Sequence, residues 1–327
     1  MFTVYVFSYN RPRFLDNCLD SIRLHAPGAE VYVLDDHSPD PGVAEVLERW
    51  RARHSVKIIP RGPTTAGLHG GLYNNMQRAF EMGVSQGVEL ALYIQDDMQL
   101  VRDITDFDID NAKRYFSTTP NSVELHVSYF KEMYRHLNEG GFDVDAERKI
   151  LLSRAPSKTA PGTFCDVGFF HFGRMKELSF SFAQGEGENA RQMLDSSFVM
   201  ACYAYPFLMN LPFPVTEYYR SKHFLLRAAE WWVGAGFYPY ESMSPAKLTQ
   251  LFERDPATLP EAENYLSARG LERGGPWIFG GAVIGMIEIG GVQGWIAGKA
   301  GRIIKTMNDC ESAWRGVARS LARATGK

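Results

Sequence analysis

The sequence predicts an α/β fold in which a parallel sheet is covered by helices on both faces. In the first hundred residues, short apolar and β-branched runs alternate with amphipathic segments of helical period, as in a parallel sheet. One of these runs, residues 89–101, contains the adjacent acids Asp96 and Asp97 directly after its apolar part. Because open α/β sheets bind ligands at the carboxyl ends of their strands, we expect a binding site at these acids.

Four strands and three helices are expected in this part of the chain. The strands are predicted at residues 3–9, 30–36, 56–60 and 89–94. The helices are predicted to begin after Asn10, after Asp40 and after a glycine-rich loop that ends at Gly71. Asn10 and Asp40 are the expected N-caps, because a proline suited to a first helical turn follows Asn10 after one residue and Asp40 directly.

Composition and charge exclude several classes of protein. The chain has 327 residues, of which 45% are hydrophobic and 22% charged, as in an ordinary globular protein of about two domains. Its net charge of −3 gives no reason to expect a nucleic-acid partner. Four cysteines without a CxxC pair argue against structural zinc and for a reducing compartment. The start lacks the basic segment of a signal peptide, so we expect a cytoplasmic protein.

The motifs of two common nucleotide-binding folds are missing from the sequence. No GxGxxG follows the first strand, which disfavours a dinucleotide, and no GxxxxGK[ST] occurs, which excludes P-loop chemistry. The acid pair favours a divalent cation instead, because neighbouring carboxylates repel each other unless a positive charge lies beside them. The alternative is a strand that ends in a solvated acidic turn.

Four segments in the first hundred residues resemble the nucleotide-sugar half of family 2 glycosyltransferases with the GT-A fold. They are FSYNRPRFLDNCLDSI, EVYVLDDHSPD, GGLYNNMQRAF and LYIQDDMQ, in the order and spacing of that family. The resemblance implies a Rossmann-like nucleotide-binding part at residues 1–104 and an acceptor-binding, catalytic part at 105–240. A helical C-terminal region is expected at 241–327. The implied reaction moves a sugar from a nucleotide donor, expected to be a UDP-sugar, to an acceptor hydroxyl with inversion.

The resemblance also implies the residues that bind the nucleotide. Tyr9 is expected to stack on the uracil, and Asp36 to accept its imide N–H. The complete implied set is Ser8, Tyr9, Asn10, Arg11, Asp36, Asn75 and Asp96.

A metal ion is the cofactor that the resemblance implies. Asp97 is expected to bind Mn²⁺ or Mg²⁺ at the donor phosphates, with Asp96 nearer the ribose and His223 as a further ligand. Such an ion would neutralise the departing nucleoside diphosphate. Gln95 stands where a strict DxD motif has its first acid.

The resemblance further implies a catalytic base in the second half of the chain. The expected bases are Glu188, Glu186 and Asp195, in that order, in the segment FAQGEGENARQMLD, where both glutamates should precede a helix. The helix dipole is an alternative reason for acids at this place. Asp166, just before the strand-like GFFHF, is expected to contact the acceptor.

Partners and alternatives are open at the level of the sequence. The acceptor is expected to be a saccharide, a lipid-linked molecule or another hydroxyl compound. The amphipathic tail after Lys299 is expected to pack on the core, form a homodimer or lie peripherally on the inner face of a membrane. The alternatives to a glycosyltransferase are a non-catalytic nucleotide-sugar-binding or scaffolding module and a sugar nucleotidyltransferase.

Overall fold

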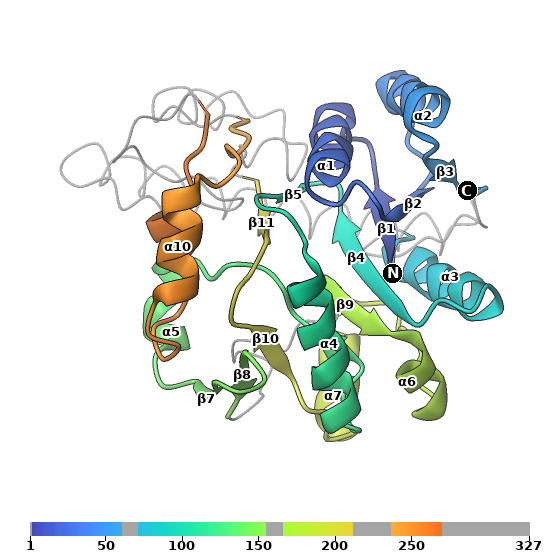
Figure 1. Ribbon diagram of the computed structural model, residues 1–327. Helices are drawn as coiled ribbons and strands as arrows, with labels where there is room; N and C mark the ends of the chain where they lie inside the picture. Colours follow the sequence, from blue (N-terminus) through green and yellow to red (C-terminus); the bar gives the residue numbers. More distant parts are fainter. Residues whose placement is uncertain (1, 61–70, 155–165, 212–236, 270–327) are drawn as a thin grey trace, which may run out of the picture. The chain divides into compact units, whose positions relative to one another are not determined.

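The computed structural model describes residues 2–60, 71–154, 166–211 and 237–269 (Figure 1). Its first part alternates strands and helices as predicted. These elements are β1 (Thr3–Ser8), α1 (Pro12–His25), β2 (Glu30–Asp35), α2 (Pro41–His54), β3 (Lys57–Ile58), α3 (Leu72–Ser85) and β4 (Leu90–Gln95). All four predicted strands and all three predicted helices are confirmed, and the strand ends differ from expectation by one or two residues.

The second part of the chain is built from shorter elements. In chain order they are β5 (Met98–Leu100), α4 (Asp106–Thr118), β6 (Glu124–Leu125), η1 (Glu132–Tyr134), α5 (Arg135–Asn138), β7 (Phe142–Asp145), β8 (Ile150–Ser153), β9 (Gly168–His171), α6 (Phe172–Glu177), α7 (Glu186–Asp195), β10 (Ala201–Tyr203), β11 (Leu208–Asn210), α10 (Pro245–Glu253) and α11 (Ala262–Tyr265). The predicted helical C-terminal region thus begins with α10 and α11, and its remainder after Arg269 lies outside the described residues.

A six-stranded sheet with the order β3-β2-β1-β4-β9-β6 forms the centre of the fold. The first four strands in this order are parallel, and β9 pairs antiparallel with both β4 and β6. The sheet is therefore mixed, with a parallel half that carries the motifs and a reversed strand beside it. Helices lie on both of its faces, which confirms the predicted α/β class (Figure 1).

Aromatic side chains fill the space between this sheet and the helices on one face. Tyr5 and Tyr93 are fully buried there and form one cluster with Met76 and Phe80 of α3 and Phe172 of α6. Val4 and Val6 are equally buried but alternate with Tyr5, so they point to the opposite face. The central strands are thus covered on both faces, as their continuous apolar runs predict.

The start of α1 differs from the prediction. Its N-cap is Arg11, and no side chain caps the helix, so the predicted N-cap role of Asn10 is wrong. Asn10 has a left-handed backbone (φ 58°), and its side-chain oxygen accepts a hydrogen bond from the Asp40 backbone N–H at 2.9 Å. The side chain is thus used to join two turns at the same sheet edge. Asp40 does cap α2, through Gly42 N–H at 2.9 Å, as predicted.

Contacts group residues 1–210 and 240–266 into one compact unit, and residues 211–239 and 267–327 into a second. All of the helices and strands given above belong to the first unit. The boundaries predicted at residues 104 and 240 stay a prediction. Within the described ranges, no helix is both long and apolar enough to cross a bilayer.

Candidate functional site

The carboxyl ends of β1, β2 and β4 bring the predicted donor residues to one edge. The Asp36 N–H donates to the Ser8 carbonyl at 2.9 Å, and the Asp96 N–H donates to the Phe7 carbonyl at 3.0 Å. These two hydrogen bonds continue the parallel ladders by one residue beyond the strands on either side of β1. The turn residues that follow each strand therefore lie side by side.

Asp96 is held in place by the first strand. Its side chain is 4% exposed and accepts hydrogen bonds from Ser8 Oγ at 3.1 Å and from the Tyr9 N–H at 3.0 Å. Burial raises the pKa of Asp96 to about 6, the Arg11 guanidinium opposes this rise, and the neighbouring Asp97 adds to it. Asp96 thus fixes the turn that carries Tyr9 and contributes negative charge to the edge.

Asp97 shares the Arg11 guanidinium with Asp96. Arg11 Nη1 lies 2.6 Å from Asp97 Oδ2 and 3.4 Å from Asp96 Oδ1. The second oxygen of Asp97, Oδ1, is buried and has no hydrogen-bond partner among the described residues. Burying a carboxylate oxygen without a partner is costly, so this atom points to a cationic ligand.

The donor set fits a divalent cation that takes most of its ligands from a substrate. Within the part of the chain that the structure describes, no three His, Cys, Asp or Glu side chains are placed to hold a metal. Mg²⁺ sites with one or two carboxylates are completed by phosphate oxygens and water, and the acid pair offers that number of carboxylates. His223, the other predicted ligand, lies outside the described residues.

Arg11→Gln is expected to tighten binding of Mn²⁺ to the nucleotide-free protein by about tenfold, because the cation no longer competes with the guanidinium for the two carboxylates. Calorimetric titration of Mn²⁺ measures this affinity. Arg13→Gln, an exposed arginine two residues further on, is the matched control and should leave the affinity unchanged. Equal or weaker Mn²⁺ binding by Arg11→Gln would show that Arg11 does not occupy the cation's place.

Tyr9 and Asp36 lie at the same edge. Tyr9 is 36% exposed, so its ring is accessible for stacking. Asp36 Oδ2 accepts the Gly71 N–H at 2.6 Å, and a Cβ at Gly71 would lie only 2.2 Å from Asp36 Oδ1. A side chain at position 71 would thus force the Asp36 carboxylate to move. Asn75 is buried on α3, where its side-chain oxygen accepts a hydrogen bond from Arg78 at 3.0 Å.

The reversed strand β9 brings Asp166 to the acid pair. The register pairs Tyr93 with Gly168, so the residues just before Gly168 lie beside the end of β4. Gln95 Nε2 donates to Asp166 Oδ2 at 2.9 Å. Burial, together with the charges of Glu186 and Asp97, raises the pKa of Asp166 to about 7, although the hydrogen bond from Gln95 opposes this rise. Asp166 is therefore a titratable carboxyl group at the sheet edge that carries Asp36, Asp96 and Asp97, called the donor edge below.

The three predicted bases occupy different places on α7. Glu186 and Glu188 lie in its first turn, not before it as expected, and Asp195 is its last residue. Only Glu186 among them is linked to the donor edge, through its electrostatic effect on Asp166. Asp195 is about 14 Å further along the helix by its rise per residue. The structure brings Glu186 to the site and does not bring Asp195 there.

Asn189 has a structural role at the start of α7. Its side chain is 1% exposed, accepts the Ala183 N–H at 2.8 Å and donates to the Ala183 and Gly185 carbonyls at 3.0 and 2.9 Å. These bonds hold the loop from which Glu186 emerges. The Asn189 amide is thus fully used within the fold.

Two residues near the acid pair were not predicted. Gln95 was noted only as a missing acid, yet its amide positions Asp166. Lys131 lies close enough to Asp97 for their charges to interact. The position of Gln95 at a strand end was a usable signal, whereas nothing near Lys131 in the sequence indicates its proximity to residue 97.

The geometry defines an α/β protein whose sheet carries an acid pair at the carboxyl ends of its parallel strands. Residues 3–81 match the family model described as Glycosyl transferase family 2. The predicted resemblance to family 2 glycosyltransferases is therefore confirmed for residues 3–81, the segment that carries the first three motifs.

Solved structures with a similar fold have little sequence identity to the chain. The crystal structure of S. aureus TarS is 13% identical with a TM-score of 0.42, and the match covers 77% of this chain and 42% of that one. The chain thus spans less than half of TarS. The mannosyltransferase PcManGT from Pyrobaculum calidifontis, solved in complex with GDP-Man and Mn2+, is 14% identical with a TM-score of 0.44, and the match covers 98% and 80% of the two chains. No curated protein matches the chain.

Proposed function

We propose that the protein is a metal-dependent glycosyltransferase that moves a sugar from a nucleotide donor to an acceptor hydroxyl with inversion. The observation that carries this proposal is the buried Oδ1 of Asp97, which has no hydrogen-bond partner among the described residues and lies at the edge that also holds Tyr9 and Asp36. UDP is the proposed nucleotide, because Tyr9 offers an aromatic face and Asp36 an acceptor for an imide N–H. A saccharide or lipid-linked hydroxyl is the proposed acceptor, and the cytoplasm the proposed location.

The donor end of the site would be organised by charge. Mn²⁺ or Mg²⁺ held by Asp97, with Asp96 beside it, would supply positive charge to the leaving nucleoside diphosphate. Arg11 is half-buried and would add a fixed donor for phosphate oxygens once it leaves the two carboxylates. The Ser8 hydroxyl and the Tyr9 N–H donate to Asp96, and these hydrogen bonds would fix the position of the Tyr9 ring relative to the acid pair.

The acceptor end would be organised by Asp166 and Glu186. Asp166 is our preferred base, because a carboxylate whose pKa is about 7 accepts a proton well near neutral pH. It would remove the acceptor hydroxyl proton while the oxygen attacks the anomeric carbon, opposite to the breaking bond to the diphosphate. Glu186 lies near enough to influence Asp166 and is the second choice, and Glu188 remains a candidate.

Calorimetric titration with UDP and with GDP, each with and without Mn²⁺, tests the donor site. We expect Mn²⁺-dependent binding of UDP that weakens at least about 100-fold in Asp97→Asn, because the amide cannot neutralise the cation. Asp103→Asn, an exposed acid after β5, is the matched control. Metal-independent binding, or unchanged binding by Asp97→Asn, would refute the metal assignment, and a preference for GDP would refute the uridine assignment.

A non-catalytic nucleotide-sugar-binding module is the second candidate. It is favoured by Asn189, the neighbour of Glu188, whose amide is committed to the loop and cannot act as a base. Donor hydrolysis distinguishes the two proposals without knowledge of the acceptor. Turnover of a UDP-sugar that depends on Asp166 or Glu186 supports the enzyme, whereas UDP binding without turnover of any donor supports the module.

A further inference from the structure

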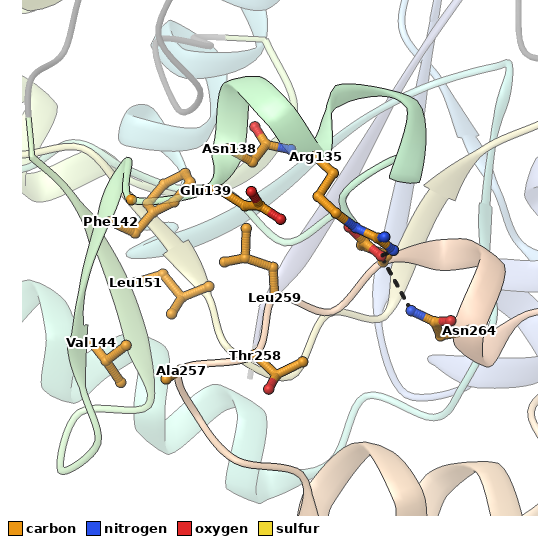
Figure 2. Close-up of a pocket in the computed structure, with 12 residues that line it drawn as sticks. Arg135, Asn138, Glu139, Phe142, Val144, Leu151, Ala257, Thr258, Leu259 and Asn264 are labelled. Atoms are coloured by element: carbon orange, nitrogen blue, oxygen red, sulfur yellow. Dashed lines mark hydrogen bonds and ion pairs between the residues drawn. The ribbon is translucent and has the colours of Figure 1, made fainter.

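A cavity of about 420 Å³ lies in the same compact unit, and none of the predicted donor or base residues line it. Its walls are α5, the β7–β8 hairpin and the segment 257–264 (Figure 2). This volume falls within the range of small-molecule sites in proteins. The cavity is therefore a separate candidate for ligand binding.

One wall of the cavity presents polar groups with unused hydrogen-bonding capacity. Arg135 donates through Nε to Glu261 Oε1 at 2.7 Å and through Nη2 to Glu261 Oε2, which fixes its guanidinium. Its Nη1 makes no hydrogen bond with the described residues. Asn138 is 5% exposed, lines the cavity, and its side chain likewise has no hydrogen-bond partner among them. The Asn138 amide can therefore hydrogen-bond to water or to a ligand in the cavity.

The facing wall is apolar. Phe142 and Leu151 are buried, Leu259 packs against them, and Val144 is 41% exposed beside them (Figure 2). Phe142 and Val144 alternate on β7, so both point to the same side of the hairpin. A bound molecule would thus meet hydrocarbon on one side and hydrogen-bonding groups on the other.

The side chains that line the cavity carry no excess positive charge. The positive charge of Arg135 is balanced by Glu261 and by Glu132, whose Oε1 lies 3.2 Å from Arg135 Nη2. Glu139 adds a further negative charge to the lining. A nucleotide, phosphate or acidic sugar would therefore find no cationic side chain in the lining that is not already paired with a carboxylate. A neutral molecule with an apolar face and a hydroxylated edge suits these walls, and a pyranose ring has both.

The cavity is connected to the donor edge through a short stretch of chain. Lys131 interacts electrostatically with Asp97, and Arg135 of the cavity wall follows four residues later. Four residues span at most about 14 Å even when extended. The ring of Phe130, directly before Lys131, packs on Phe142 at a centroid distance of 5.2 Å. The cavity wall at Arg135 therefore lies within about 14 Å of Lys131, a length that an oligosaccharide can span.

We propose that this cavity binds a neutral saccharide through Asn138, Arg135 and the Phe142–Leu151 wall. Its role as a subsite for the distal part of an acceptor glycan rests on the proposed glycosyltransferase function. Binding itself does not require donor, metal or turnover.

Saturation-transfer NMR with two neutral trisaccharides, N-acetylchitotriose and cellotriose, at millimolar concentration tests the proposal on the full-length protein. We expect at least one of them to bind, and Asn138→Leu and Val144→Trp each to weaken binding by about tenfold or more. Val144 is exposed, so its replacement should not disturb folding. Leu24→Trp, an exposed residue of α1 that is not in the cavity lining, is the matched control and should bind like the wild type.

The possible outcomes separate this proposal from the proposed function. Absence of binding by both trisaccharides, or equal binding by all variants, overturns the saccharide cavity. Calorimetry with UDP and Mn²⁺ on the same variants reports the donor site independently. Trisaccharide binding that is lost in Val144→Trp, in a protein that binds no nucleotide, would support the cavity and refute the glycosyltransferase.

Discussion

Asp166→Asn is expected to lower kcat by about 10²–10⁴-fold while nucleotide binding is retained, because the amide cannot accept the acceptor proton. The substituted side chain keeps an oxygen for the hydrogen bond from Gln95, so the geometry of the site should survive. Donor hydrolysis with a UDP-sugar measures the effect without a known acceptor. Glu188→Gln, an exposed residue in the first turn of α7, provides the comparison. A greater loss in Glu188→Gln would return the role of base to that residue.

The same variant has a predicted signature in pH dependence. Because burial holds the pKa of Asp166 at about 7, kcat/KM of the wild type should rise with pH up to about 7. The folded state binds the Asp166 proton more tightly than the unfolded chain does. The stabilisation that this proton provides is therefore fully present below about pH 4. It is lost as pH rises through about 7. In EDTA at pH 8, Asp166→Asn should therefore be more stable than the wild type, by on the order of 1–3 kcal/mol. Equal stability of the two proteins at pH 8 would contradict a buried charge at this position.

Asp108→Ala is expected to lower the free energy of unfolding by about 3–5 kcal/mol, because it leaves a buried guanidinium without its counter-ion. Arg102 is 3% exposed and Asp108 1% exposed. Arg102 donates to both Asp108 oxygens at 3.0 and 2.7 Å, and the Tyr203 hydroxyl donates to the same carboxylate at 3.0 Å. One carboxylate thus joins the chain after β5, helix α4 and strand β10.

Urea unfolding followed by circular dichroism measures this loss. Asp110→Ala on the exposed side of the same helix is the control and should change stability by no more than about 0.5 kcal/mol. A double variant, Arg102→Met with Asp108→Leu, removes both charges and should recover much of the loss. If the double variant is as unstable as Asp108→Ala, the loss of stability comes from losing the ion pair and not from leaving the Arg102 guanidinium without a counter-ion.

The parallel half of the sheet was predictable because its signals are local. Each strand of this half is an apolar run bounded by turn residues, and each helix begins near a proline or glycine. The acid pair at the end of β4 and Asp36 at the end of β2 were placed at one edge for the same reason, since parallel strands end together. Asn10 shows the limit of this reasoning. Its side chain had two hydrogen-bonding choices, a local helix cap and the turn after β2, and only the tertiary structure selects between them.

The acceptor side was less predictable because its contacts join distant parts of the chain. The hydrogen bond between Gln95 and Asp166 depends on the antiparallel pairing of β9 with β4, which no local pattern indicates. No local pattern in the sequence indicates that Arg102 and Asp108 form a buried ion pair. Arg102 also donates hydrogen bonds to the Tyr205 and Pro206 carbonyls, about a hundred residues further along the chain. The order of the three candidate bases depended on the family resemblance, whereas their distance from the acid pair is set by where α7 begins.

The late position of β9 in the chain has a consequence for folding of the nascent protein. Strand β4 is complete by residue 95, yet its partner on that side is formed only by residues 168–171. Until those residues emerge from the ribosome, the edge of β4 that later pairs with β9 exposes its backbone N–H and C=O groups to solvent. The side chains of β4 are mostly apolar, and they are buried in the folded protein. Such an edge promotes association between chains. A fragment that ends near residue 104 is therefore expected to aggregate, although it contains every motif of the donor site, and one extended through α7 should be soluble.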